Sequence, residues 1–386
     1  MRARLTGGTL LASLAAISLW ACASGSASGP AGDAPAEGSA AASSKARTYV
    51  NNTESALGLT FDTRGRLLYA EKDSGRIIRV ARGKRTTLAR LRVAGGGEAG
   101  LLGLTSGPDG HVWAYYTTSR DGCPNPTSGE SSGEINAHCI WRLRPSGGKL
   151  KADKLVFSAG HPSSASNHVG GGLHLGPDGA LYLGLGDLGE NGDPEKGPSR
   201  AQDLSVPFGK ILRLNPSATN RGATGNPTSC GNASNTAKRT IEDGRIWACG
   251  LRNPFSFDWD RQGRLWVADV GDGCDEMNIG RAGVNYGWEP PRTDCAGRGS
   301  GRPVLKLSGT PSGVAIPKSK QAGQWRGDVF FGVFADSSLK RYDLSTKKRR
   351  TISGARGRTG WALVATDRYL YMSNGSKISR LKLPGA

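Results

Sequence analysis

The chain has 386 residues and a net charge of +19, from 51 lysines and arginines against 32 aspartates and glutamates. Hydrophobic residues make up 37% and charged residues 22%, which excludes a disordered or membrane-embedded chain. Glycine is frequent, at 58 residues, and because it follows no collagen-like period it favours an all-β fold rich in turns. The basic residues are spread along the sequence rather than gathered in one helix or tail. We therefore expect a basic surface facing anionic envelope material and no nucleic-acid partner.

The first 21 residues have the features of an export signal. Arg2 and Arg4 precede the apolar run LLASLAAISLW, which is too short to span a bilayer. The run ends at LWAC, where a small residue precedes Cys22, as in the lipobox of bacterial lipoproteins. Trp20 is unusual at its position, so simple cleavage and secretion stay open as the alternative. Residues 22–48 are small and polar and predict a flexible tether, with Cys22 as a lipid anchor on the outer face of the cell membrane.

Six cysteines remain after Cys22, an even number that indicates disulfides in an exported protein. Proximity along the chain predicts three local loops. The expected pairs are Cys123 with Cys139, Cys230 with Cys249, and Cys274 with Cys295. A zinc site is the alternative, but the chain has no CxxC pair and its histidines are scattered.

A repeat organises the rest of the chain in order. A turn with Gly or Asp and a short apolar strand recur at FDTRGRLLYAEKD, SGPDGHVWAYYT, LGPDGALYLGLGD, WDRQGRLWVADVGD, QWRGDVFFGVFAD and ATDRYLYMSNG. A second strand with an internal basic residue follows in every copy but the fourth, which has DEMNIG there. Spacings of about 40 to 85 residues fit one four-stranded antiparallel sheet per copy. We predict a six-bladed β-propeller over residues 49–386, closed by RTYVNN pairing near the last blade.

Loops at one end of a propeller crowd around its central channel, so chemistry collects there. Glu98, in GGGEAGLLGL, places a carboxylate on a loop that a ligand can approach closely; a flexible turn is the alternative. His168, in NHVGGGLHLGPDGALYLGLGD, precedes three glycines. A flat ligand can lie against such a backbone, and an imidazole exchanges protons near neutral pH. A surface histidine beside a hairpin is the alternative.

Two later stretches add polar groups. Arg252 and Asn253, in GLRNPFSFDWD, supply a planar cation and an amide suited to polarising a carbonyl or binding a carboxylate, or to bonding loop carbonyls. The stretch ADVGDGCDEMNIG crowds four carboxylates around two glycines, and such oxygen-rich loops bind calcium. These carboxylates are Asp269, Asp272, Asp275 and Glu276. Their spacing is not that of an EF-hand, and a solvated acidic turn is the alternative.

Together these stretches resemble the soluble quinoprotein sugar dehydrogenases, the glucose/sorbosone and aldose sugar dehydrogenase family. The resemblance covers residues 55–380 and is carried by GEAGLLGL, the His168 stretch, AQDLSVPFGKILRLN, IWACGLRNPFSFDWD, DVGDGCDEMN and NYGW. It implies a six-bladed propeller that holds pyrroloquinoline quinone (PQQ) above a calcium ion. It also implies oxidation of the anomeric carbon of aldoses to lactones by hydride transfer to the quinone.

The resemblance assigns roles to the residues already selected. His168 is implied to be the general base, and Arg252 to stabilise negative charge on the quinone oxygens. Asn253 and Glu98 are implied to contact the cofactor.

Further roles concern calcium and the cofactor's carboxylates. The backbone carbonyls of Gly271 and Asp272 are implied calcium ligands, and Asp275 and Glu276 are implied to support the loop or bind further calcium. The groups that bind the cofactor's carboxylates fall in the weakly matching fifth blade, where the candidates are Lys318, Lys320, Lys340 and Arg341, with Lys318 and Lys340 taken as cofactor contacts. The chain departs from the family at Gly172, where relatives have Gln or Arg.

The residue types agree with this chemistry. Hydride abstraction from an alcohol carbon needs a base, an electron sink and positive charge at the sink, and no side chain is such a sink. No GxGxxG follows a strand here, which argues against a nicotinamide cofactor. The sequence predicts an exported PQQ- and calcium-dependent aldose dehydrogenase that passes electrons to an external acceptor. The alternative is a non-catalytic, lipid-anchored propeller that binds an envelope glycan or a partner protein; a calcium-dependent lactonase would leave Arg252 without a role.

Overall fold

The computed structural model describes residues 45–130, 133–189, 199–231, 241–290 and 299–386. From residue 45 onward, the described residues belong to one compact unit. The predicted export signal, Cys22 and the tether up to residue 44 lie outside the described residues. Within the described ranges, no helix combines the length and the apolar character that a membrane crossing requires.

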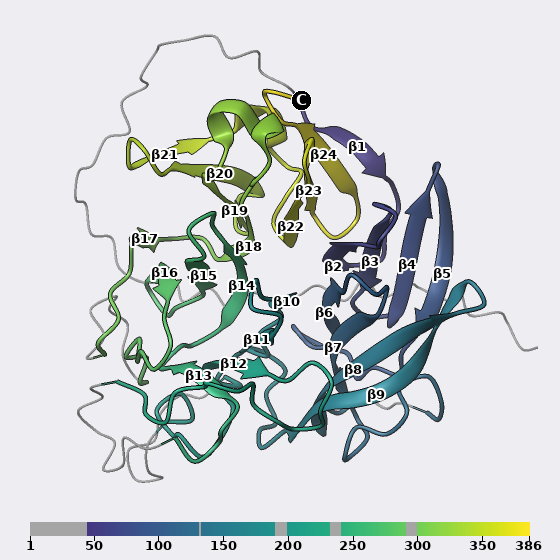
Figure 1. The fold of residues 1–386 in the computed structure, drawn as a ribbon, viewed down its shortest axis with the longest axis vertical. Coiled ribbons are helices and arrows are strands. Elements are labelled where there is room, and N and C mark those ends of the chain that lie inside the picture. Colours follow the sequence, from purple (N-terminus) through teal and green to yellow (C-terminus); the bar gives the residue numbers. More distant parts are fainter. Residues whose placement is uncertain (1–44, 131–132, 190–198, 232–240, 291–298) are drawn as a thin grey trace, which may run out of the picture. The chain divides into compact units, whose positions relative to one another are not determined.

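The described part of the chain forms six four-stranded antiparallel sheets around a common centre (Figure 1). The first sheet contains β2 (Ala56–Phe61), β3 (Leu67–Glu71), β4 (Arg76–Ala81) and β5 (Lys84–Arg90), and the second β6 (Leu101–Ser106), β7 (Val112–Thr118), β8 (Ala137–Ser146) and β9 (Lys149–Gly160). The third contains β10 (Leu173–Leu175), β11 (Leu181–Leu185), β12 (Lys210–Leu214) and β13 (Ile246–Cys249). The fourth contains β14 (Pro254–Trp259), β15 (Leu265–Asp269), β16 (Asp275–Gly280) and β17 (Leu305–Leu307).

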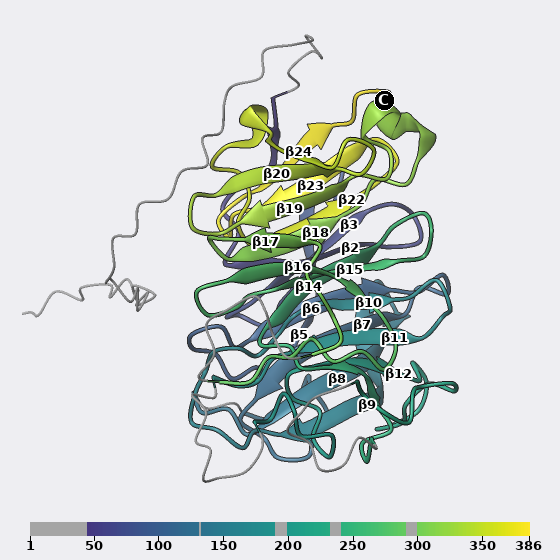
Figure 2. The same cartoon turned by 90° about the vertical axis from the view of Figure 1, so that its left-hand side faces the viewer.

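The last two sheets complete the ring. The fifth contains β18 (Pro311–Ala315), β19 (Val329–Val333), β20 (Ser338–Asp343) and β21 (Lys348–Thr351), and the sixth β22 (Ala362–Ala365), β23 (Tyr369–Ser373), β24 (Ile378–Lys382) and β1 (Arg47–Val50). Two short 3₁₀ helices, η2 (Lys320–Trp325) and η3 (Ser353–Ala355), lie in connections of the fifth and sixth blades. The predicted six-bladed propeller is therefore confirmed, and the DEMNIG segment is β16, the third strand of its blade. Figure 2 shows the ring from its side, with β20 and β24 near one end of the view and β8, β9 and β12 near the other.

The ring closes as predicted, by pairing of the N-terminal strand with the last blade. Strand β1 is antiparallel to β24, with Arg47 opposite Arg380 and Thr48 opposite Ser379. The guanidinium of Arg380 lies 4.9 Å from the ring centroid of Tyr49. The hydrogen bonds between β1 and β24 join the two ends of the ring. Without β1, the sixth sheet would have three strands and β24 would be its unpaired edge.

The innermost strands run in the same direction, which gives the ring two chemically distinct ends. Along two neighbouring inner strands, the residues in contact follow one another in the same order, as they do in parallel strands. The Leu175 N–H donates to Thr105, the Val314 N–H to Ser256 and the Ile316 N–H to Asp258. We call the end where the inner strands begin the first rim and the end where they finish the second rim.

Close packing between inner strands explains part of the glycine content. A Cβ on Gly103 would lie 2.6 Å from the Gly171 carbonyl oxygen, and one on Gly172 would lie 2.7 Å from the Phe257 ring. Both separations are far below van der Waals contact, so side chains there would push neighbouring blades apart. The glycine at position 172 therefore has a packing reason.

Two predicted disulfides are confirmed, between Cys123 and Cys139 and between Cys230 and Cys249. Cys274 is also disulfide-bonded. Its expected partner, Cys295, lies outside the described residues.

Candidate active site

Three loops at the first rim bring together side chains that are distant in sequence. Glu98, His168 and Asn253 come shortly before the inner strands β6, β10 and β14, in three successive blades. The Glu98 carboxylate oxygen Oε2 accepts hydrogen bonds from the His168 backbone N–H at 2.9 Å and from Nδ2 of Asn253 at 3.1 Å. The Oδ1 atom of Asn253 accepts from the Gly170 N–H at 3.0 Å. One carboxylate and one amide thus connect the loops of three blades.

His168 is held in an unusual conformation with one ring nitrogen fixed. Its φ of 51° lies in the left-handed region, which costs energy for a residue with a side chain and is common at functional sites. Its Nδ1 lies 2.7 Å from Oδ1 of Asp187, which is fully buried. Because a carboxylate only accepts, Nδ1 carries a proton, and in the neutral imidazole this places the lone pair on Nε2. In the part of the chain that the structure describes, Nε2 makes no hydrogen bond.

The sequence interpretation did not include Asp187 or Trp288 in the site. Oδ2 of Asp187 accepts a hydrogen bond from the Trp288 indole N–H at 2.7 Å, and Oδ1 also accepts from the Gly189 N–H at 3.0 Å. Asp187 follows β11, the strand that returns from the second rim to the first, 19 residues after His168. An acidic residue where a hairpin's second strand returns to the level of a candidate base is the signal that could have found it.

Arg252 lies in the same part of the first rim as His168, and the two residues are connected through Asp187 and Trp288. The guanidinium carbon of Arg252 lies 5.4 Å from the ring centroid of Trp288, the residue that also bonds Asp187. Its Nη1 donates to the Val270 carbonyl at 3.0 Å. The Asp187 N–H donates to the Arg252 carbonyl at 2.8 Å, which joins the two loops directly.

A buried carboxyl group supports the Arg252–Asn253 segment. The backbone N–H groups of both residues donate to Asp269, at 3.1 Å and 2.7 Å. Burial, and then the neighbouring Glu276 carboxylate opposite it on β16, raise the pKa of Asp269 to about 8. The backbone of Arg252 and Asn253 is therefore held by Asp269, a carboxyl group whose charge depends on its burial and on the charges beside it.

The predicted acidic loop is only partly a loop. Gly271 and Asp272 lie between β15 and β16, whereas Asp275 and Glu276 are the first two residues of β16. The Asp275 carboxylate accepts from the N–H groups of Gly271 at 3.1 Å and Thr310 at 2.8 Å, and burial raises its pKa. A small cavity beside Arg252 is lined by Asp269, Gly271, Asp272 and Glu276. Across the described residues, no three His, Cys, Asp or Glu side chains are grouped as metal ligands, so an ion here would depend on backbone carbonyls.

The structure does not bring the selected lysines to this cluster. Lys318 follows β18 at the second rim, where Nζ contacts Asp258 at 2.8 Å. Lys340 lies on β20 and donates to Thr351 at 2.8 Å. Arg341 is held by Asp328 and Asp343 at 2.7 and 2.8 Å, and Lys320 is exposed in η2.

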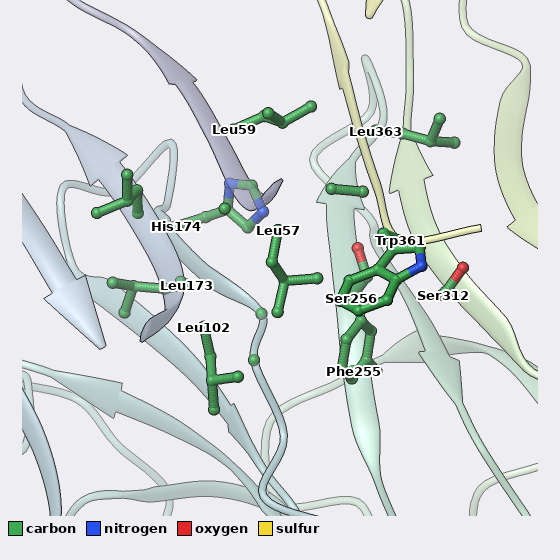
Figure 3. A pocket seen from close by; sticks show the side chains of 16 residues that line it. Leu57, Leu59, Leu102, Leu173, His174, Phe255, Ser256, Ser312, Trp361 and Leu363 are labelled. Carbon is green, nitrogen blue, oxygen red and sulfur yellow. The ribbon is translucent and has the colours of Figure 1, made fainter. Parts of the chain in front are cut away.

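The central channel itself is largely filled. Figure 3 shows Leu57, Leu102, Phe255 and Trp361 facing one another between the inner strands. The free space among the lining side chains is about 40 Å³, too little for an organic cofactor. A larger cavity of about 630 Å³ opens at the second rim, where Lys318 is one of its lining residues. A flat ligand of the His168 cluster would therefore lie on the first rim and not inside the channel.

These features define a six-bladed propeller with a histidine held by a buried carboxylate and a guanidinium at one rim. Residues 53–380 match the family model described as Glucose / Sorbosone dehydrogenase, and the chain belongs to this family. It is 26% identical over 303 residues to the aldose sugar dehydrogenase YliI of Escherichia coli K12, covering 72% of this chain and 74% of that protein.

Solved structures agree with this assignment. The chain is similar to the PQQ-bound form of an aldose sugar dehydrogenase from Streptomyces coelicolor, with 27% identity, a TM-score of 0.67, and coverage of 87% of this chain and 96% of that one. The apo-form of the soluble aldose sugar dehydrogenase from Escherichia coli has the same fold, with 24% identity, a TM-score of 0.69, and coverage of 87% and 98%.

Proposed function

We propose that the protein is an exported PQQ-dependent aldose dehydrogenase that oxidises the anomeric carbon of a sugar to a lactone. The observation that carries the proposal is the His168–Asp187–Trp288 chain of hydrogen bonds beside the Arg252 guanidinium. Similarity to a PQQ-bound aldose sugar dehydrogenase supports the cofactor and the substrate class.

The side chains supply the proton chemistry. Asp187 keeps the proton on Nδ1, so Nε2 of His168 takes the proton of the sugar's anomeric hydroxyl. The buried Asp187 carboxylate then stabilises the imidazolium that forms. When bound, PQQ supplies the electron sink that accepts the hydride. The Arg252 guanidinium provides positive charge at the same rim, where negative charge develops during the transfer.

The residues present fit a flat, anionic quinone. Trp288 offers a partly exposed indole ring, Arg252 a guanidinium beside it, and Asn253 an amide fixed by Glu98. Aromatic stacking and a planar cation are the groups that recognise such a molecule. Lys318 and Lys340 lie away from these residues, where they contact Asp258 and Thr351. Neither lysine is therefore placed to bind the carboxylates of a cofactor beside Arg252 and Trp288.

Calcium is the second proposed cofactor. The backbone carbonyls of Gly271 and Asp272 would hold it, with Asp275 and Glu276 supporting the segment. The small cavity beside Arg252 supports a cation at this place, because Asp269, Asp272 and Glu276 bring three carboxyl groups to its lining.

Export is proposed from the N-terminal sequence and supported by the disulfides, which form in oxidising compartments. The protein would be anchored by a lipid on Cys22, or secreted, and would pass electrons to an acceptor outside the cytoplasm. The non-catalytic alternative, a propeller that binds a glycan or a partner protein, leaves the ordered His168–Asp187–Trp288 chain without a role.

Reconstitution tests the proposal. The purified protein is loaded with PQQ and calcium, and bleaching of an artificial electron-accepting dye is followed with a panel of aldoses. We expect turnover with at least one aldose only when PQQ is present. Binding of PQQ without turnover of any aldose would contradict the proposal.

A further inference from the structure

A second chain of hydrogen bonds lies directly behind the His168 loop. The Tyr115 hydroxyl donates to the Val169 carbonyl at 2.6 Å and lies 2.9 Å from Nδ1 of His138. Nε2 of His138 lies 2.8 Å from Nδ1 of His161, and Nε2 of His161 lies 2.8 Å from the Ala165 carbonyl. Tyr115 and His138 are fully buried. The chain therefore connects the residue after His168 with a loop residue three positions before it.

In its neutral form this chain has fewer protons than it has hydrogen-bond contacts. Both ends of the chain are carbonyl oxygens, which only accept, so each of the four contacts requires a proton from Tyr115, His138 or His161. A neutral tyrosine has one such proton, and each neutral imidazole has one. The neutral chain is therefore one proton short, and one contact places two lone pairs against each other. Four contacts of 2.9 Å or less fit a chain that carries a fourth proton.

We propose that Tyr115, His138 and His161 form a buried site for one shared proton, whose occupancy controls the hold of Tyr115 on Val169. With the fourth proton present, every contact is satisfied and the tyrosine proton stays on Val169. Without it, one of the four contacts has no proton, and Nδ1 of His138 competes with the buried Val169 carbonyl for the tyrosine proton. The proposed role of His168 as a base gives this control its functional meaning.

The three residues act by positioning and not by relaying protons. The chain ends on the Val169 carbonyl, which has no proton to pass on to His168. Occupancy of the site therefore changes how the His168 loop is held, while proton transfer from the substrate proceeds through Nε2 of His168.

The surroundings set the pH at which the site fills. His138 packs against the Phe208 ring and His161, and Arg200 is the charged side chain whose field acts on His161 among the described residues. Burial, with the field of His161, lowers the pKa of His138 to about 3, and burial also lowers that of His161. The site is therefore empty at neutral pH and takes its proton below the ordinary histidine value of about 6.5. His161, which is less buried than His138, is the entry point.

Nuclear magnetic resonance of the full-length protein without PQQ tests this, since the chain has only five histidines. We expect the ring nitrogens of His138 and His161 to move together with one midpoint below about pH 6.5, because a shared proton titrates as a pair. The carbonyl carbon signal of Val169 should follow the same midpoint. Separate midpoints for the two rings, or a Val169 signal that ignores them, would overturn the proposal.

Two variants separate a shared proton from ordinary packing. Tyr115→Phe leaves two contacts for two protons, so the neutral pair is satisfied and its midpoint should fall by roughly one pH unit. His161→Gln supplies two N–H donors without charge, so the Val169 signal should stop responding to pH. His111→Gln, at an exposed turn, is the matched control and should leave the midpoint unchanged.

If the protein unfolds in acid before the site takes its proton, the tautomer of His138 measured at pH 7.5 still tests the proposal. In His161→Gln we expect its proton on Nδ1, facing Tyr115, whereas a proton on Nε2 would overturn the proposal. Because these measurements need neither PQQ nor sugar, their failure is distinct from failure of the dehydrogenase assay.

Discussion

The buried carboxylate of Asp187 binds Trp288 through one oxygen and His168 through the other, both at 2.7 Å. Asp187 is fully buried, so water cannot replace either partner. The indole and the imidazole come from segments 120 residues apart, and this carboxylate fixes the two rings relative to each other. The proton position on His168 follows from this relationship.

His168→Ala removes the proposed base. We expect dye reduction with an aldose to fall by about 10²–10⁴-fold, the usual contribution of general-base catalysis, with PQQ binding largely kept. Turnover by the reconstituted protein and PQQ titration followed by fluorescence check the two expectations. His111→Ala is the control, and equal activity of His168→Ala and the control would remove His168 from the mechanism.

Asp187→Asn tests the orientation of the base. The asparagine oxygen would accept from Trp288, which turns the amide nitrogen toward His168 and forces the histidine proton onto Nε2. We expect turnover to fall by about 10³-fold or more because the acceptor nitrogen is lost. Histidine resonances should report the changed tautomer directly. An unchanged tautomer with normal turnover would show that Asp187 does not set the proton position.

Glu98 offers a matched pair of substitutions. Glu98→Gln keeps an oxygen that accepts from the His168 N–H and from Asn253, so we expect activity within about tenfold of wild type. Glu98→Ala leaves both donors without a partner, at a cost of about 1–3 kcal/mol in unfolding free energy. Urea unfolding and steady-state kinetics measure the difference. Equal stability of the two variants would mean that these bonds do not hold the loops.

Calcium removal tests the proposed metal. An ion bound only by the folded state stabilises it, so chelation should lower both the melting temperature and the activity, and added calcium should restore them. Backbone carbonyls cannot be substituted, so Glu276→Gln serves as the probe variant and should weaken the response to calcium. An identical melting curve with and without chelator would contradict a calcium site between Gly271 and Glu276.

His174 predicts a pH dependence of stability. Burial lowers its pKa; Asp258 opposes this and Lys318 adds to it. Below about pH 6.5 the unfolded chain binds a proton that the folded protein refuses, so stability falls as the pH falls. We expect thermal unfolding of His174→Gln to vary less between pH 7 and 5 than that of wild type, by up to about 1 kcal/mol per pH unit. A parallel pH dependence of the two proteins would refute this.

The fold was readable from local patterns. Each copy of the recurring hairpin corresponds to strands of one blade, and the DEMNIG segment is strand β16. Strand β1 pairs with β24, where RTYVNN was expected to close the ring. Two disulfides followed from proximity, because the bonded cysteines lie 16 and 19 residues apart. Such features are local, so neighbouring residues carry the information.

The site was only partly readable. Residue type and resemblance selected His168, Arg252, Asn253 and Glu98, which the first rim brings together. They also selected Lys318, which the direction of β18 places at the second rim. The rim at which a side chain lies depends on the direction of its strand, and the type of residue does not reveal that direction.

By itself, the sequence determined a repeated hairpin that closes into six blades, because alternating apolar residues and turn residues act over a few positions. Only the tertiary structure decided that Asp187 and Trp288 orient His168, and that Tyr115 reaches Val169 through the second blade. These contacts join residues that are far apart along the chain. Their geometry is set by how the blades pack, and no local pattern encodes it.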